Sequence, residues 1–184
     1  DIFMQTNFTI FKSIIEKGGI VKAIPAKGAG EQPRSWFDKL GSWAQSELQM
    51  PAPPAYIVPK AMEGGKIKEL KGPLAKFLES KPDLIDQLFE NAGFGEVGEN
   101  DAIFFVASPD VGKLNQQASS IRTKLGTDLG LSETGVFRFC WIVDFPMFEY
   151  NEDTQEIEFS HNPFSMPQGG LKALTEQDPL DILA

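Results

Sequence analysis

The spacing of apolar residues changes several times along the chain, and each change marks an expected element. Apolar residues three and four positions apart predict amphipathic helices, and these are expected at residues 7–19, 35–48, 72–78, 81–93 and 114–129. Short apolar runs between turn residues predict strands, and these are expected at 20–24, 55–58 and 101–108. Because the helices and strands interleave, the pattern predicts an α+β fold, a small antiparallel or mixed sheet flanked by helices.

Two of these elements indicate where the core lies. The run at 101–108, D-A-I-F-F-V-A-S, is apolar through its middle, as is typical of a strand buried on both faces. Trp36 and Trp43 share the apolar face of the helix expected at 35–48. Two tryptophans on one helical face form either part of a core or a platform for stacking bases, and the surrounding aliphatic residues favour the core.

From Phe137 onward the spacing becomes strictly alternating. The segment F-R-F-C-W-I-V-D predicts a strand at 137–144 that ends or bends at Pro146. A turn at Asn151 and a second alternating run at 156–160 complete an antiparallel hairpin over 137–161 with an acidic tip. The change in spacing places a domain boundary near residues 130–136.

Composition narrows the class of protein. The chain has 184 residues, a net charge of −9 and a pI near 4.7, which argues against a broad basic surface for nucleic acid. No apolar run approaches the roughly 18 residues of a membrane-spanning helix. Cys140 is the only cysteine, so an internal disulfide and a cysteine-based zinc site are excluded, and a reducing compartment is indicated. The first residue, Asp1, leads us to expect a segment of a longer protein.

Most familiar catalytic signatures are absent. Gly28-Ala-Gly30 lacks the third glycine of a dinucleotide-binding loop and is interpreted as an ordinary loop. With one histidine, the chain has no multi-histidine metal site, and a Cys140–His161 nucleophile pair is not expected because the two residues fall at distant points of the hairpin. The acidic residues of the hairpin tip are interpreted as a solvated turn rather than as an acid–base pair.

Polar side chains are concentrated between residues 144 and 168, within a segment made stiff by prolines. The polar members are Asp144, Glu149, His161, Asn162, Ser165 and Gln168, and the prolines are Pro146, Pro163 and Pro167. A rigid loop with mixed polar groups suits a small polar ligand better than a core. From the residues alone, His161 is either a ligand contact or an incidental surface residue.

Two motifs in this region, with three upstream segments, carry a resemblance to a known family. The motifs are W-I-V-D-F-P-M-F-E at 141–149 and H-N-P-F-S-M-P at 161–167, and the segments are G-P-L-A-K-F-L at 72–78, D-A-I-F-F-V-A at 101–107 and R-T-K-L-G-T-D-L-G-L at 122–131. Together they resemble bacterial-type aspartyl-tRNA synthetase, a class II enzyme. The resemblance implies an insertion (GAD-like) domain at 1–131 and part of the class II catalytic domain at 132–184.

The resemblance also implies an activity for the longer protein. Enzymes of this family activate L-aspartate with ATP and Mg²⁺ and transfer the aspartyl group to tRNA, and they are cytoplasmic homodimers with no membrane association. The histidine that contacts substrate aspartate maps to His161, while Asn162 stands where many members have a second histidine. The arginines that bind ATP in the family have no counterpart in the chain, so the chain alone is expected to be inactive.

Two other hypotheses remain open from the sequence. One is a non-catalytic GAD-type binding module related to a domain of the tRNA-dependent amidotransferases. The other is an unrelated fold that binds a small molecule. The segment D-F-P-M-F-E followed by H-N-P-F distinguishes the first of these from the ligase, because a free-standing module has no need of a catalytic-domain hairpin.

Overall fold

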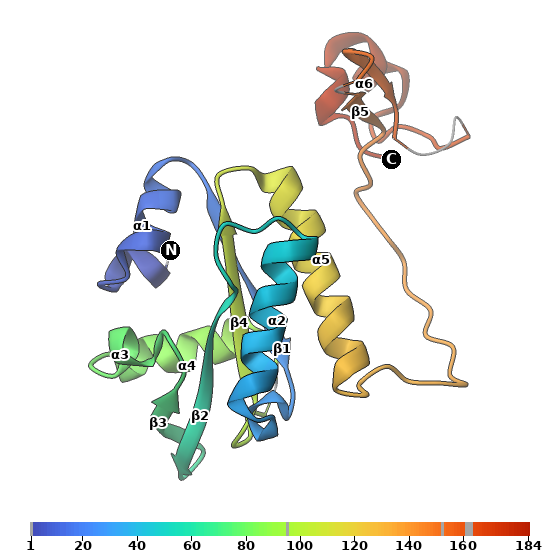
Figure 1. Ribbon diagram of the computed structural model, residues 1–184. Coiled ribbons are helices and arrows are strands. Elements are labelled where there is room, and N and C mark those ends of the chain that lie inside the picture. Colours follow the sequence, from blue (N-terminus) through green and yellow to red (C-terminus); the bar gives the residue numbers. More distant parts are fainter. Residues whose placement is uncertain (1, 95, 152, 161–163) are drawn as a thin grey trace. The chain divides into compact units, whose positions relative to one another are not determined.

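The computed structural model describes residues 2–94, 96–151, 153–160 and 164–184, and it contains two compact units (Figure 1). The first unit ends at Thr134 and the second begins at Gly135. Each unit has its own sheet, and the two are described separately.

The first unit is built on a four-stranded antiparallel sheet, which confirms the predicted α+β class. Its strands are β1 (Ile20–Ala26), β2 (Ala55–Glu63), β3 (Lys66–Lys71) and β4 (Ala102–Ser108), in the order β1-β4-β2-β3. Strand β4 pairs with both β1 and β2, and its residues 102–106 are all buried. The prediction of a strand covered on both faces is therefore confirmed.

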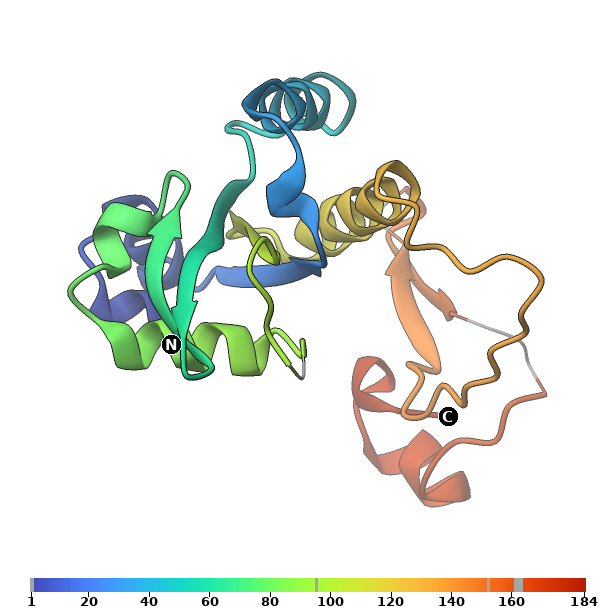
Figure 2. The same cartoon turned by 90° about the horizontal axis from the view of Figure 1, so that it is seen from below.

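Helices pack on both faces of this sheet (Figure 2). The helices are α1 (Thr9–Glu16), α2 (Arg34–Glu47), α3 (Ala75–Leu78), α4 (Pro82–Asn91) and α5 (Val111–Asp128), with short 3₁₀ turns at Ile2–Gln5 and Ala29–Glu31. Phe104 of β4 packs with α2 and α5, whereas its neighbour Phe105 packs with α1, α3 and α4. Successive side chains of one strand thus enter two separate cores, because they point to opposite faces of a sheet.

Two details of the sheet differ from the prediction. Strand β1 does not stop at Pro25 but continues to Ala26, because β1 lies at the edge of the sheet, where proline is tolerated. Strand β3 was not predicted. Its buried residues, Ile67 and Leu70, are three apart rather than two, and its pairing with β2 shifts register beyond Pro59, so the sequence does not show strand alternation.

Asp101 ties two loops of the first unit together at the entrance to β4. Its side chain is buried, and its two carboxylate oxygens accept hydrogen bonds from the backbone N–H groups of Gly28 and Gly98, each at 2.9 Å. Gly30 lies against the same turn, where its N–H donates to the carbonyl of Asn100 at 2.7 Å. The Gly28-Ala-Gly30 segment is therefore a structural loop, as predicted.

We expect Asp101→Ala to destabilise the first unit by about 2–3 kcal/mol, because the substitution leaves two amide donors without their partner. Urea denaturation of the 184-residue chain measures this change. The matched control is Glu99→Ala, since Glu99 is an exposed acid in the same turn, and it should change stability by less than about 0.5 kcal/mol. Equal effects of the two substitutions would contradict the role of Asp101.

The second unit is a hairpin packed on one short helix. It comprises β5 (Phe148–Asn151), β6 (Glu156–Phe159), α6 (Gly170–Glu176) and a 3₁₀ turn at Pro179–Asp181. Among the described residues of this unit, Met147, Ala173 and Ile182 are buried together. The antiparallel hairpin is confirmed, but its first strand lies further along the chain than predicted.

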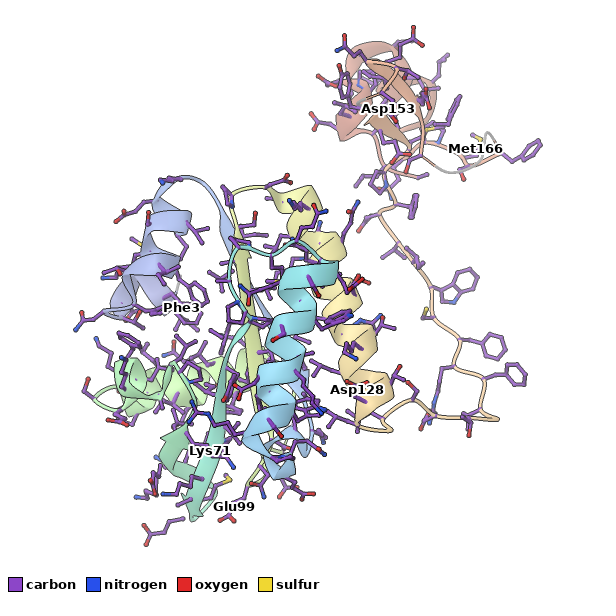
Figure 3. All side chains as sticks on the ribbon, viewed as in Figure 1. Phe3, Lys71, Glu99, Asp128, Asp153 and Met166 are labelled. Atoms are coloured by element: carbon purple, nitrogen blue, oxygen red, sulfur yellow. The ribbon has the colours of Figure 1, made fainter. Side chains whose placement is uncertain are left out.

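The predicted strand at 137–144 is wrong: this segment is irregular and pairs with no other described strand. Figure 3 shows its side chains projecting from an extended stretch of chain. Phe139 and Trp141 are 95% and 94% exposed. Strand geometry is stabilised by pairing, so an alternating sequence without a partner strand does not form one.

Candidate functional site

The central residue of the predicted site, His161, lies outside the described residues, together with Asn162 and Pro163. The predictions that concern them are therefore untested by the structure. What the structure describes is the frame from which this loop leaves and to which it returns, formed by Ser160 on one side and Gln168 on the other.

The entry to the loop is fixed by the hairpin. Phe148 of β5 pairs with Phe159 of β6, and their rings lie 4.9 Å apart. The next residue, Ser160, donates its backbone N–H to the carbonyl of Met147 at 3.1 Å. The backbone that leads into position 161 is thereby held against β5.

The exit from the loop is held by two hydrogen bonds of Gln168. Its backbone N–H donates to the carbonyl of Leu183 at 2.8 Å, and its side-chain amide Nε2 donates to Oδ1 of Asp144 at 3.0 Å. Helix α6 begins shortly after, with the N–H of Gly170 donating to the carbonyl of Pro167 at 2.9 Å.

The segment 144–147 supports both ends of the loop, and it is itself paired with residues 182–184. Phe145 and Ala184 exchange backbone hydrogen bonds at 3.3 and 2.7 Å, and the N–H of Met147 donates to the carbonyl of Ile182 at 2.9 Å. Met147 and Ile182 are also buried together. The segment that contacts both ends of the loop is therefore itself held in place by residues 182–184.

The structure brings together some members of the predicted polar cluster and separates others. Asp144 and Gln168 are joined by a hydrogen bond. Glu149 instead lies opposite Glu158 in the register of the two hairpin strands. Glu158 accepts hydrogen bonds from Asn151 and from Thr154, which is consistent with an exposed, hydrogen-bonded tip.

The second unit is strongly acidic in comparison with the first. Residues 135–184 include 9 acidic and 2 basic residues, a net charge of −7, out of −9 for the whole chain. Asp153 marks the acidic tip in Figure 3. Among the described residues, no group of three or more His, Cys, Asp or Glu side chains is arranged to hold a metal ion.

Sequence patterns did not indicate a cavity of about 760 Å³ in the first unit, between α2 and the β2–β3 hairpin. The rings of Phe37 and Tyr56 stack on its wall with centroids 4.3 Å apart. Burial, followed by the negative charge of Asp38, raises the pKa of the Tyr56 hydroxyl. Trp36 and Trp43 are half-buried and pack against the core that contains Phe37, in agreement with the predicted core role.

Comparison with known proteins decides the family. The GAD domain family matches residues 11–117, which is more than half of the chain and lies within the first unit. The chain belongs to the GAD domain family. This GAD-containing chain is also similar over its full length to the aspartate–tRNA(Asp/Asn) ligases of Beijerinckia indica, Acidiphilium cryptum and Gluconobacter oxydans.

The identities to these three ligases are 47%, 50% and 46%, and each alignment covers 100% of the GAD-containing chain. The similarity therefore extends through the second unit and through the segments that carry the sequence resemblance. The predicted resemblance to aspartyl-tRNA synthetases is confirmed. The chain spans 30%, 29% and 28% of the length of these relatives.

The sequence analysis found no apolar run long enough for a membrane-spanning helix. Among the described residues, no helix combines the length and the apolar character that crossing a bilayer requires.

Proposed function

We propose that the chain is part of an aspartate–tRNA ligase, hereafter the parent enzyme, which activates L-aspartate with ATP and Mg²⁺ and transfers the aspartyl group to tRNA. The observation that supports this most strongly is the identity of 46–50% to named ligases across both units. A stand-alone GAD module related to the amidotransferases accounts for the match at 11–117 but not for similarity up to Ala184. An unrelated small-molecule-binding fold accounts for neither.

Within the parent enzyme we assign residues 1–131 to the insertion domain and 132–184 to part of the catalytic domain. The exposed apolar segment that precedes β5 supports this assignment. Phe137, Phe139 and Trp141 are each more than 85% exposed, and large apolar side chains gathered in this way are typical of a surface that another part of a protein covers. In the parent enzyme this segment forms a strand that pairs with strands outside the present chain.

One substitution in this segment should have different effects on stability in the isolated chain and in the parent enzyme. We expect Phe139→Ser to leave the stability of the isolated chain unchanged within about 0.5 kcal/mol, because the ring already contacts solvent there. In the parent enzyme the same substitution should cost about 3 kcal/mol, because it removes a buried ring. Denaturant midpoints of the two proteins measure both effects, and an unchanged parent enzyme would contradict a buried strand.

His161 is proposed to bind the substrate aspartate. An imidazole donates hydrogen bonds to a carboxylate and, when protonated, adds an opposite charge. This matters in a unit of net charge −7, which otherwise disfavours an anionic amino acid. Asn162 retains a hydrogen-bond donor beside it but does not titrate.

Mg²⁺ in the parent enzyme would neutralise phosphate charge on ATP as aspartate attacks it. The groups that bind ATP belong to other parts of the parent enzyme, so the isolated chain should support no aspartate-dependent exchange between ATP and pyrophosphate. The described residues instead hold the substrate loop in place. We assign the parent enzyme to the cytoplasm, as a homodimer, as the family resemblance implies.

The tRNA substrate is proposed from the relatives, whose names specify tRNA(Asp/Asn). We expect the purified parent enzyme to attach aspartate to transcripts of both tRNA-Asp and tRNA-Asn, and the charging rate on each measures this directly. Charging of tRNA-Asp alone would limit the proposal to one tRNA. Charging of neither, with an active transcript control, would reject the ligase function.

A further inference from the structure

We propose that the cavity of the first unit, between α2 and the β2–β3 hairpin, binds a free α-amino acid with an apolar side chain. Arg34 binds its carboxylate, Asp38 binds its ammonium group, and Phe37 and Tyr56 contact its side chain. Nothing proposed above for the parent enzyme uses this cavity. All the residues that line it lie between positions 32 and 73, so the inference goes beyond the ligase function and does not depend on it.

The cavity has the size and the mixed lining of a small-molecule site. Its volume of about 760 Å³ falls within the range of roughly 300–1,000 Å³ that is typical of ligand pockets. Phe37, Pro54 and Val58 are buried and form an apolar part of its wall, while charged side chains from α2 and β3 also line it. Such a lining suits a ligand that has a charged end and an apolar body.

The ring of Tyr56 is held at the cavity wall by its neighbours. It stacks on Phe37 with ring centroids 4.3 Å apart and an angle of 25° between the planes. Gly72 has a φ of +116°, and a Cβ at this position would lie 3.0 and 3.1 Å from the ring carbons Cδ2 and Cε2 of Tyr56. The backbone therefore passes close against the ring, and the phenol is positioned before any ligand binds.

Two opposite charges that line the cavity are not paired with each other. Arg34 and Asp38 lie four residues apart on α2, a spacing at which Lys124 and Asp128 on α5 form an ion pair at 3.1 Å. Among the described residues, neither Arg34 nor Asp38 has an ion-pair partner. A ligand that carries both charges satisfies both side chains, and the zwitterion of an α-amino acid carries them on adjacent groups. A guanidinium binds a carboxylate through two parallel hydrogen bonds.

Both charges act on the hydroxyl group of Tyr56, which indicates that they lie near the same part of the cavity. Burial and then the negative charge of Asp38 raise the pKa of Tyr56, whereas the positive charge of Arg34 lowers it. With a raised pKa the hydroxyl stays protonated at neutral pH, so it can donate a hydrogen bond to the ligand carboxylate. Lys71, labelled in Figure 3, donates from Nζ to the carbonyl of Gly30 at 2.9 Å and adds a second positive charge to the lining.

The test is an NMR titration of the isotope-labelled 184-residue chain with L-phenylalanine, because amide shifts both locate and measure binding. We expect saturable shifts at the cavity, with a Kd below about 10 mM. N-acetyl-L-phenylalanine lacks the ammonium group and L-phenylalaninamide lacks the carboxylate. Each should bind about 10-fold more weakly, because a hydrogen bond between charged groups is lost. L-Alanine should also bind at least about 10-fold more weakly, because it leaves the apolar wall uncovered.

Variants assign each group of the ligand to a side chain. Arg34→Met and Asp38→Asn should each weaken binding of L-phenylalanine about 10-fold, and Tyr56→Phe, which keeps the ring, about 3-fold. Arg34→Met should also bind L-phenylalanine and its amide equally, and Asp38→Asn should bind L-phenylalanine and its N-acetyl derivative equally. The matched controls Lys39→Met and Glu47→Gln remove exposed charges of α2 that do not line the cavity, and they should stay within about 2-fold of the unsubstituted chain.

Amide spectra of each free variant show whether it is folded, and the ligand series on the unsubstituted chain tests the site without any variant. The proposal is overturned by an absence of saturable shifts at the cavity, by equally tight binding of the N-acetyl or amide derivative, or by unchanged affinity in Arg34→Met and Asp38→Asn. Tighter binding of L-aspartate than of L-phenylalanine would overturn the apolar side chain of the ligand. None of these results bears on the ligase function, which exchange between ATP and pyrophosphate tests in the parent enzyme.

Discussion

Phe105→Ala is expected to lower the free energy of unfolding of the first unit by about 3–5 kcal/mol. Phe105 is 1% exposed and lies in the middle of β4, between Ala23 of β1 and Ala55 of β2. Its ring meets that of Phe3 edge-to-face at 5.1 Å. The neighbouring strands present small side chains, so the cavity left by the ring has little to fill it, and the cost falls in the upper part of the usual range.

The chain supplies a chemically identical control at an exposed position. Phe137→Ala makes the same change where the ring is 86% exposed, and it should alter the stability of the isolated chain by less than about 0.5 kcal/mol. Urea denaturation followed by circular dichroism compares the two variants. A Phe105→Ala variant as stable as Phe137→Ala would show that β4 is not the centre of the fold.

His161→Ala in the parent enzyme is expected to raise the KM for aspartate by roughly 10- to 100-fold, while the KM for ATP changes by less than about 3-fold. The physical reason is the loss of the hydrogen bond proposed between His161 and the substrate carboxylate, since a hydrogen bond to a charged group contributes about 1.5–3 kcal/mol. Uniform loss of ground-state binding appears in KM, whereas loss of transition-state stabilisation appears in kcat.

The control for this substitution is Glu156→Ala, an exposed residue of β6 in the same acidic unit. It should leave both KM values unchanged within about 2-fold. Steady-state exchange kinetics, with aspartate and ATP varied in turn, give the four constants. Equal weakening for aspartate and ATP in His161→Ala would argue against a direct aspartate contact.

The spacing of apolar residues predicted the elements whose burial depends on residues close together in the sequence. The apolar run at 101–108 and the amphipathic face of the helix around Leu40 were sufficient to predict β4 and α2, because burial of those faces does not depend on distant register. The segment 137–144 has an equally clear alternation but forms no strand. A strand also requires a partner strand, and no pattern within the segment reports whether one is present.

Long-range contacts define the features of the site that the sequence did not reveal. The residues 144–168 were indicated as a stiff polar segment, yet their pairing with residues 182–184 and the hydrogen bond between Asp144 and Gln168 arise only in the folded unit. The role of Asp101 was not predicted for the same reason, because one of its two donors, Gly28, lies 73 residues away. The sequence motif identified the loop, but the contacts that hold its two ends form between residues that are distant in the sequence.

Exchange between ATP and pyrophosphate tests most directly whether this chain is part of an enzyme that activates aspartate. The full-length parent enzyme is assayed for exchange between ATP and pyrophosphate with L-aspartate, L-asparagine or L-glutamate as the amino acid. We predict rapid exchange with L-aspartate and background exchange with the other two. Exchange that is absent with L-aspartate, or as fast with L-asparagine, would contradict the account.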